Sequence, residues 1–207
     1  MNRVYLKDFR KLPWRIVEAE LVELDRVGLD KTDAYWERSR EYWREILAGT
    51  YGQEPPESDD WEWSRKPSTL EEGEGQVLAV RCEGDVQGLM LLNRRSQSCR
   101  STSASSTGCC LYVEYLEAAP WNQKGYAGVH VRYGGIGSAL IYAAVQLSKM
   151  VGCWGALGLH ALPGAEGFYR YLGFEDLGVD AVEGMHYFEL GEKAAIMLLA
   201  EADDEDS

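Results

Sequence analysis

The stretch "RYGGIGSAL", Arg132 to Leu140, places three glycines within four residues, directly before an apolar helical pattern. Glycine at the start of a helix costs stability unless the bare backbone is needed there. The first amides of a helix lack intrahelical partners and carry the positive end of the helix dipole, so they can bind an anion. Bare glycine backbone would let a large phosphate approach these amides, and Arg132 adds a positive charge. Alternatively, the glycines only form a tight strand-to-helix connection.

The segment matches neither of two familiar phosphate-binding patterns. It lacks the GxxxxGK[ST] of a P-loop, and it does not spell GxGxxG. The residues before it, "APWNQKGYAGVHV" (119–131), read as irregular, so no strand is expected to lead directly into the glycines. The segment therefore predicts a local anion site of another kind.

The charge of the chain is uneven around this segment. The 207 residues carry a net charge of −13, and residues 151–207 hold twelve acids and two bases. Residues 101–150 hold only two acids and three bases. This balance disfavours nucleic-acid binding and suits a cationic substrate. No signal-peptide core or membrane-length apolar run is found, so we expect a cytoplasmic protein without membrane attachment.

The cysteines and serines carry two further expectations. The five cysteines are odd in number and scattered, without a paired CxxC, so neither a disulfide framework nor a zinc or other metal site is expected. We expect reduced thiols. The Ser-rich tract Ser96–Gly108 has little apolar surface to bury and is expected to be a mobile loop that folding does not need.

Hydrophobic periodicity and turn residues predict a sheet with helices packed on it. One domain is expected over residues 1–200, followed by an acidic disordered tail at 201–207. Strands are expected at 3–9, 76–82, 85–95, 109–118, 154–162 and 184–190, with a further strand before the last of these. Helices are expected from Pro13 to Gly28, from about Asp33, from 136 to 151, at 164–174 and near the C-terminus, and a hairpin turn at 83–85.

Two motifs resemble one known family. Residues Arg132 to Gly137 spell R-x-x-G-x-G, which resembles the acyl-CoA pyrophosphate loop of the GNAT N-acetyltransferase superfamily. The segment "AEGFYRYLGF" (165–174) is similar to the family's fourth-helix element, and the two motifs follow in the family's order. The chain departs from the family in the extra stretch 119–131 and in Leu162, where Asn is frequent. The resemblance implies an α/β (α+β) fold with a mixed, mostly antiparallel central sheet flanked by helices.

The resemblance also implies a reaction, the transfer of an acetyl group from acetyl-CoA to a primary amine without a metal. The acceptor would be a small-molecule or protein amine, expected to be cationic, with no nucleic acid or membrane partner; a homodimer is left open. Alternatives are another acyl donor, a catalytically silent acyl-CoA-binding or interaction module, or a generic α/β binding domain. The implied cofactor-binding residues are Leu116, Glu117, Arg132, Tyr133, Gly134, Gly135, Ile136, Gly137 and Ser138.

Four residues are candidates for proton transfer. The resemblance gives Tyr169 the role of protonating the departing thiolate, although this side chain could merely pack in its helix. For the base, Glu114, Glu117 and His160 stay open, as does a water relay. Glu114 and Glu117 have opposite parity on one strand, so only one can face a given side. His160 is a candidate because the unperturbed pKa of histidine as a residue type suits a base near neutral pH, yet a lone histidine is more often structural. A backbone N–H near Leu116–Glu117 would stabilise the oxyanion.

Overall fold

The computed structural model describes residues 3–48, 55–101, 104–124 and 131–205. The chain divides into two compact units. Unit 1 comprises Met1–Glu72, Gln76–Leu91 and Leu116–Leu140, and unit 2 comprises Gly73–Gly75, Leu92–Tyr115 and Ile141–Ser207. Strands β4 (Asp85–Ser98) and β5 (Cys109–Ala118) and helix α3 (Ile136–Met150) run through both units. The single domain expected over residues 1–200 stays a prediction.

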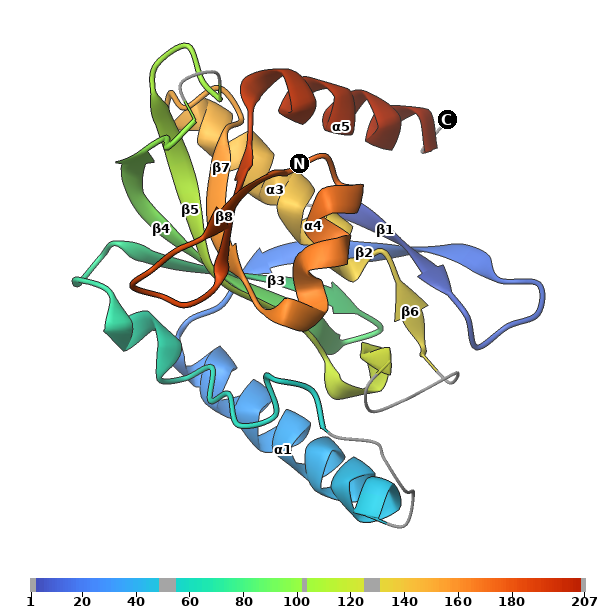
Figure 1. Cartoon of the computed structure of the whole chain (residues 1–207). Coiled ribbons are helices and arrows are strands. Elements are labelled where there is room, and N and C mark those ends of the chain that lie inside the picture. Colours follow the sequence, from blue (N-terminus) through green and yellow to red (C-terminus); the bar gives the residue numbers. More distant parts are fainter. Residues whose placement is uncertain (1–2, 49–54, 102–103, 125–130, 206–207) are drawn as a thin grey trace. The chain divides into compact units, whose positions relative to one another are not determined.

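Unit 1 is built on strands near the N-terminus and one long helix (Figure 1). Its other elements are β1 (Arg3–Asp8), β2 (Arg15–Glu23), α1 (Arg26–Ala48), η1 (Lys66–Thr69), β3 (Gly75–Cys82), η2 (Pro120–Asn122) and β6 (Tyr133–Gly134). β2 pairs antiparallel with β1 and with β3. Along β2, Val17, Ala19 and Leu21 are more buried than their neighbours Glu18 and Glu20, as the period of a strand requires.

The helix expected from Pro13 to Gly28 is wrong. This region forms β2 and then the start of α1, and the helix expected from about Asp33 is the continuation of α1. Gly28 lies in the first turn of α1, where its N–H donates to Asp25 Oδ1 at 2.8 Å. The alternating side chains of β2 also fit a helical spacing, and pairing with two neighbouring strands decides in favour of the strand.

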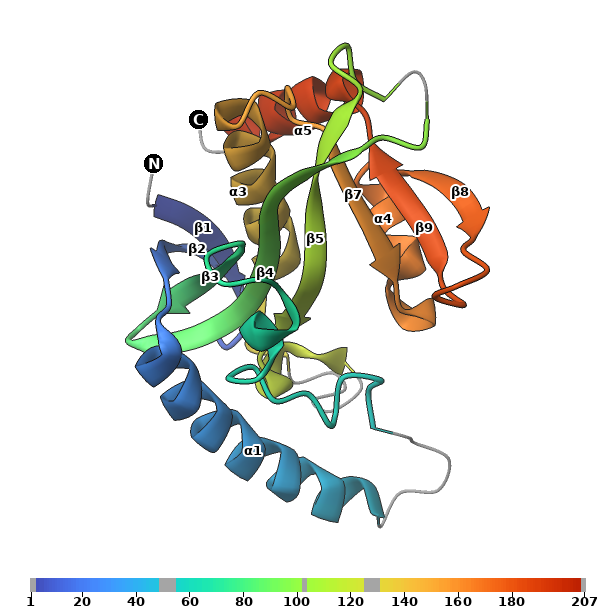
Figure 2. The ribbon, with the colours of Figure 1, turned by 90° about the vertical axis from the view of Figure 1, so that its left-hand side faces the viewer.

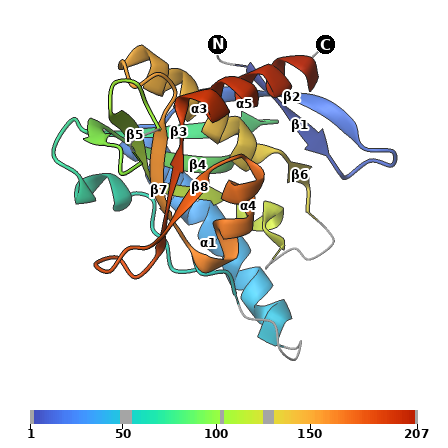
Figure 3. The same ribbon diagram turned by 45° about the horizontal axis from the view of Figure 1, so that its top comes forward.

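Unit 2 contains the C-terminal strands and helices. Its further elements are β7 (Leu157–Ala161), η3 (Pro163–Ala165), α4 (Glu166–Tyr171), β8 (Glu175–Val179), β9 (His186–Leu190) and α5 (Glu192–Glu205). Figure 2 shows β8 and β9 beside β7, with α4 against them. The start of α5 lies beside the C-terminal part of α3, where Ala195 and Val145 both approach Gly155 (Figure 3).

The two faces of the unit 2 sheet differ in chemistry. Cys110, Tyr112 and Glu114 alternate along β5 with the buried apolar Leu111 and Val113. In the paired strands the same polar face carries Gly158, His160, Tyr187 and Glu189, as the registers β5–β7 and β7–β9 require. The opposite face carries the apolar core, with Leu157, Leu159, Phe188 and Leu190.

Hydrogen bonds connect the strands in the order β6-β1-β2-β3-β4-β5-β7-β9-β8. β5 and β7 are parallel, and the pairs for which a register is described on either side of them are antiparallel. The mixed, mostly antiparallel sheet flanked by helices is therefore confirmed. The hairpin turn at Glu83–Asp85 and the strand 109–118 are confirmed as well. None of the helices in the described ranges is long and apolar enough to cross a bilayer.

The Ser-rich tract is docked rather than loose in its described residues. Ser96–Ser98 belong to β4, and the N–H of Cys99 donates to the carbonyl oxygen of Gly108 at 2.9 Å. Ala104 is buried, and its carbonyl oxygen accepts the N–H of Glu192 at 2.7 Å. The expected mobile loop is wrong for these residues, because backbone hydrogen bonds within the tract and to the start of α5 hold a segment that has few apolar side chains. Residues 102–103 lie outside the described ranges.

The cysteines and the acidic C-terminal residues both differ from what the sequence predicts. Cys109 and Cys153 form a disulfide between residues 44 positions apart, so the expectation of reduced thiols is wrong for this pair. Cys82, Cys99 and Cys110 are free. The acidic tail expected over 201–207 begins inside α5, which extends to Glu205 because the alanine-rich and glutamate-rich sequence favours helix. Residues 206–207 lie outside the described part of the chain.

Candidate functional site

The glycine segment forms a sharp connection from a short strand into α3. Tyr133 and Gly134 form β6, which pairs antiparallel with β1 through Asp8 and Lys7. A strand does lead into the glycines, contrary to the prediction from the sequence. Gly135 has φ +88°, and its carbonyl oxygen accepts the N–H of Ala139 at 2.9 Å, so it directly precedes the helix. A positive φ explains why glycine stands at position 135.

Close packing around the start of α3 uses two more glycines. A Cβ on Gly134 would lie 2.7 Å from a ring carbon of Phe9. A Cβ on Gly88, in β4, would lie 2.3 Å from Ile136 Cγ2 and 3.2 Å from the carbonyl oxygen of Glu117. The first residue of α3 therefore packs directly on β4 beside the end of β5. The structure brings together, within unit 1, the glycine segment and the strand end that the sequence assigned to one site.

A buried amide network fixes the segment from behind. Asn122 Oδ1 accepts the N–H of Tyr133 at 3.0 Å, and Asn122 Nδ2 donates to Gln87 Oε1 at 3.0 Å. Trp121 Nε1 also donates to Gln87 Oε1, at 2.8 Å. The start of the extra stretch 119–131 thus orients the segment. Gln87 was missed in the sequence, because nothing local marks a glutamine that acts on residues more than thirty positions away. Residues 125–130 lie outside the described ranges.

Side chains and backbone have separate roles in the glycine segment. Tyr133 and Ile136 are buried, and the Tyr133 hydroxyl donates to Glu83 Oε2 at 3.0 Å, so only their backbone groups can reach a ligand. Arg132 is exposed, with its guanidinium 5.3 Å from the centre of the Trp121 ring. An exposed cation therefore stands beside the unpaired first amides of α3, an arrangement that favours an anion. Gly137 and Ser138 are half-buried in the first turn.

Glu117 is buried at the end of β5 and bound to fixed donors. Its carboxylate accepts Arg40 Nη2 at 2.8 Å, Trp63 Nε1 at 2.6 Å and Gln123 Nε2 at 3.1 Å. Burial raises the pKa of Glu117, and the charge of Arg40 opposes the shift. A carboxylate held by these donors is well placed to support the fold. The backbone of Glu117 lies at the strand end, next to the half-buried Leu116.

Glu114 and His160 lie on the polar face of unit 2. Glu114 accepts Asn93 Nδ2 at 3.0 Å, and burial raises its pKa. His160 Nδ1 bonds the Tyr112 hydroxyl, and His160 Nε2 lies 3.3 Å from Asp180 Oδ2. Tyr112 and Asp180, which are not among the residues predicted from the sequence, form with His160 a chain of hydrogen bonds able to relay a proton. The shared parity of Tyr112 and Glu114 on β5 is the signal that could have indicated Tyr112.

Tyr169 is buried in α4 among aromatic rings. Its ring centroid lies 5.4 Å from that of Phe174 and 6.0 Å from that of Phe188. Burial raises the pKa of Tyr169, so the phenol keeps its proton at neutral pH. Tyr171, two residues on, is exposed.

The architecture can now be compared with known proteins. A PaiA N-acetyltransferase from Thermoplasma acidophilum, solved in complex with coenzyme A, aligns with TM-score 0.51 and 18% identity over 84% of this chain and 99% of that chain. The GNAT domain of PAT from S. lividans aligns with TM-score 0.53 and 14% identity over 91% of this chain and 95% of that chain. This chain has the GNAT fold. A GNAT-family acetyltransferase from Listeria monocytogenes agrees, with TM-score 0.52, 14% identity, and 84% and 95% coverage.

At these identities the likeness is one of fold. No family model matches the chain, and no curated protein matches its sequence. The GNAT fold therefore emerges from the arrangement of the elements rather than from overall sequence similarity.

Within this GNAT fold the candidate residues fall into separate groups. Leu116, Glu117 and the glycine segment come together in unit 1. Glu114 and His160 share one face of the unit 2 sheet, where the rings of His160 and Tyr187 lie 4.9 Å apart. Tyr169 contacts Phe188, the neighbour of Tyr187 on β9, and therefore lies on the opposite face of that sheet.

Proposed function

We propose that the chain transfers an acetyl group from acetyl-CoA to an amine. The observation that carries the proposal is the structure at the start of α3. The exposed Arg132 and Gly135, which has a positive φ, lie next to the first amides of this helix, and Asn122 fixes the backbone of the segment. A pyrophosphate is the ligand that fits this combination, because it offers two charged groups to a row of N–H donors. A protein of the same fold was solved with coenzyme A.

The reaction asks three things of the chain. The amine must lose a proton before its lone pair attacks the thioester carbon and the C–N bond forms. The oxyanion needs a fixed donor, for which we propose a backbone N–H at Leu116–Glu117. The C–S bond then breaks and the thiolate takes a proton, for which we propose the phenol of Tyr169, because a phenol is protonated at neutral pH and can donate to a thiolate.

For the base we favour the polar face of unit 2 over Glu117. Arg40, Trp63 and Gln123 already occupy the Glu117 carboxylate. Glu114 has a raised pKa, and His160 can pass a proton toward Asp180. A carboxylate and an imidazole are both groups that act as general bases in enzymes. The pH dependence of kcat in Glu114→Gln and His160→Asn distinguishes the two candidates. The variant that lacks the base should lose the rise of kcat with pH.

Coenzyme A binding tests the glycine segment by calorimetry. Arg132→Glu should weaken binding about 10-fold or more, because it places an acid beside the phosphates. Gly135→Val should do the same by closing the approach to the amides. Lys149→Glu, exposed at the other end of α3, is the matched control and should bind as the unaltered protein does. Equal affinity of Arg132→Glu and the unaltered chain would contradict the phosphate-binding role.

Acetylation of an amine panel, read by mass spectrometry, tests turnover. Binding of coenzyme A without any product would favour the silent acyl-CoA-binding module. Once an acceptor is found, Tyr169→Phe should lower kcat by roughly 10²–10⁴ and leave the melting temperature nearly unchanged. Tyr171→Phe, on the exposed face of the same helix, should keep kcat. Unchanged kcat in Tyr169→Phe would remove this residue from the mechanism.

A further inference from the structure

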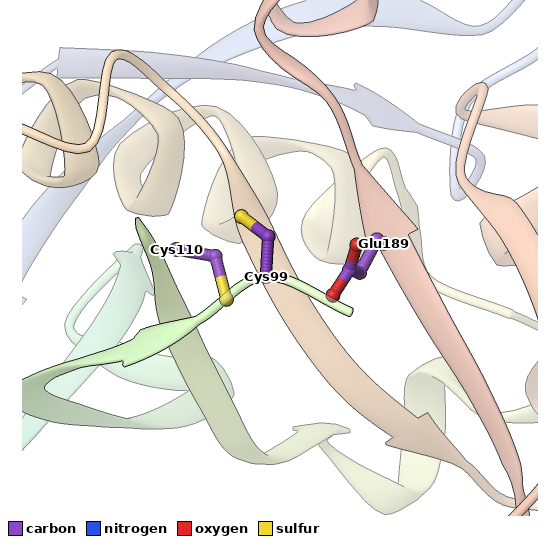
Figure 4. Close-up of side chains that lie close together, drawn as sticks. All are labelled: Cys99, Cys110 and Glu189. Atoms are coloured by element: carbon purple, nitrogen blue, oxygen red, sulfur yellow. The ribbon is translucent and has the colours of Figure 1, made fainter. Parts of the chain in front are cut away.

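Two thiols and a carboxylate converge on the polar face of unit 2, and none of the three is a group used in the proposed reaction. The sulfur atoms of Cys99 and Cys110 and a carboxylate oxygen of Glu189 all lie within 4.8 Å of one another (Figure 4). We propose that Cys99, Cys110 and Glu189, here called the thiol–carboxylate cluster, bind a divalent transition metal ion of the zinc type. The proposal is independent of acetyl transfer.

A glycine lets the side chains around the cluster pack close to the backbone. Gly158 in β7 pairs with Glu189 in β9 on one side and with Tyr112 in β5 on the other. A Cβ at position 158 would lie 3.2 Å from Cys110 Sγ and 2.5 Å from the Tyr187 hydroxyl. Any side chain there would displace these groups, so the glycine allows the thiol of Cys110 and the hydroxyl of Tyr187 to pack against β7 beside Glu189.

Glu189 is oriented by groups that carry no charge. Its carboxylate accepts the N–H of Arg100, the N–H of Ser101 at 2.8 Å and the Tyr187 hydroxyl at 3.1 Å. The side chain is almost fully buried, and within the described ranges it makes no ion pair. Such neutral partners fix the direction of a ligating carboxylate, as they do around known metal sites, and they leave its negative charge uncompensated.

The ligand set indicates the kind of ion. Thiolates select borderline or soft metals, and two sulfurs with one carboxylate oxygen suit zinc with one position left for water. Burial raises the pKa of Cys110 to about 12, and burial with the charge of Glu189 raises that of Cys99. Binding therefore displaces two thiol protons to solvent as two metal–sulfur bonds and one metal–oxygen bond form, so affinity should rise with pH.

Cobalt(II) is the probe that tests the cluster. The full chain, reduced under argon, should bind one Co²⁺ and show thiolate-to-cobalt absorption, which Zn²⁺ then displaces. Cys99→Ser should abolish the absorption, and Tyr187→Phe should weaken binding about 10-fold. Cys82→Ser, at a free buried thiol of unit 1, is the matched control and should bind as the unaltered chain does.

Each other outcome overturns the proposal. Absence of thiolate absorption in the reduced chain excludes a metal site of this kind. Binding that survives Cys99→Ser and is lost in Cys109→Ser would assign the ion to the reduced Cys109–Cys153 pair instead. Cys99 is half-buried and its serine variant should fold, so this variant decides even if Cys110→Ser does not fold.

Discussion

The two units treat their buried carboxylates differently. Unit 1 pairs them with arginines: Glu117 meets Arg40, and Asp8 meets Arg10. In unit 2, Glu189 is just as buried as Glu117, yet backbone amides and a hydroxyl surround it. An arginine neutralises the charge, whereas neutral donors only stabilise it. Unit 1 therefore balances its buried charges behind the glycine segment, and unit 2 keeps a buried carboxylate without an arginine partner in its described residues.

The largest effect is expected on removing the arginine partner of Glu117. Arg40→Met leaves a buried carboxylate without its cation and should lower the free energy of unfolding by about 3–5 kcal/mol, measured by urea denaturation. Arg38→Met, exposed on the same helix, should stay within about 0.5 kcal/mol. A loss below about 1 kcal/mol in Arg40→Met would show that Glu117 does not need a charged partner, and the contrast between the units would disappear.

A smaller loss is expected at Glu189. In Glu189→Gln the side chain keeps one oxygen, which can accept only one of the N–H groups of Arg100 and Ser101, and its NH₂ group faces the remaining N–H. The free energy of unfolding should therefore fall by about 2 kcal/mol. Hydrogen exchange at these two amides should speed up. Glu192→Gln makes the same chemical change at an exposed contact and should cost little. Equal stability of the two variants would mean that the Ser-rich tract is not held by Glu189.

The pH dependence of stability should show the arginine pairing of Asp8. Hydrogen bonds from Arg10 lower the pKa of Asp8 to about 2 from 3.8, so its contribution is complete above about pH 4 and disappears as the pH falls toward 2. The contribution is about 1 kcal/mol, because Arg10 is partly exposed. Asp8→Asn should flatten the decline of the melting temperature between pH 4 and 2. The same decline in both proteins would contradict the pairing.

The smallest effect is expected at Glu114. Burial raises its pKa, so the folded state is penalised as the pH rises above the ordinary value of 4.5. Glu114→Gln removes this penalty and keeps an oxygen for Asn93, so stability at pH 7 should stay equal or rise by less than about 1 kcal/mol, measured by thermal unfolding. A clear loss of stability would show that the charge of Glu114 has a cationic partner.

Local sequence patterns predict much of this fold. The strand 109–118 combines β-branched and aromatic residues, and the hairpin turn at 83–85 contains a glycine with φ +89°. The helix after the glycines shows a clear apolar face, and the glycines themselves indicate an anion site. β2 was missed because Val17 and Leu21 satisfy both a helical and a strand period, which only the neighbouring strands resolve.

The remainder depends on partners far apart in the chain. The guanidinium of Arg40 bonds Glu117, which lies 77 residues later, and the backbone N–H of Arg100 bonds Glu189, which lies 89 residues later. No local signal announces either contact, so the sequence analysis took Glu117 for a free base candidate and the Ser-rich tract for a mobile loop. Tyr169 and His160 were identified as candidates, but their placement on opposite faces of one sheet required the register of β7 with β9.

The contact between Gly88 and Ile136 has an evolutionary consequence. A Cβ at position 88 would lie 2.3 Å from the Ile136 side chain, so the two positions compete for one volume. Alanine at 88 should be tolerated only in homologues that carry a smaller residue at 136. The residues at positions 88 and 136 should therefore covary among related sequences. This covariation would identify the start of α3 even in relatives that no longer carry the glycine motif.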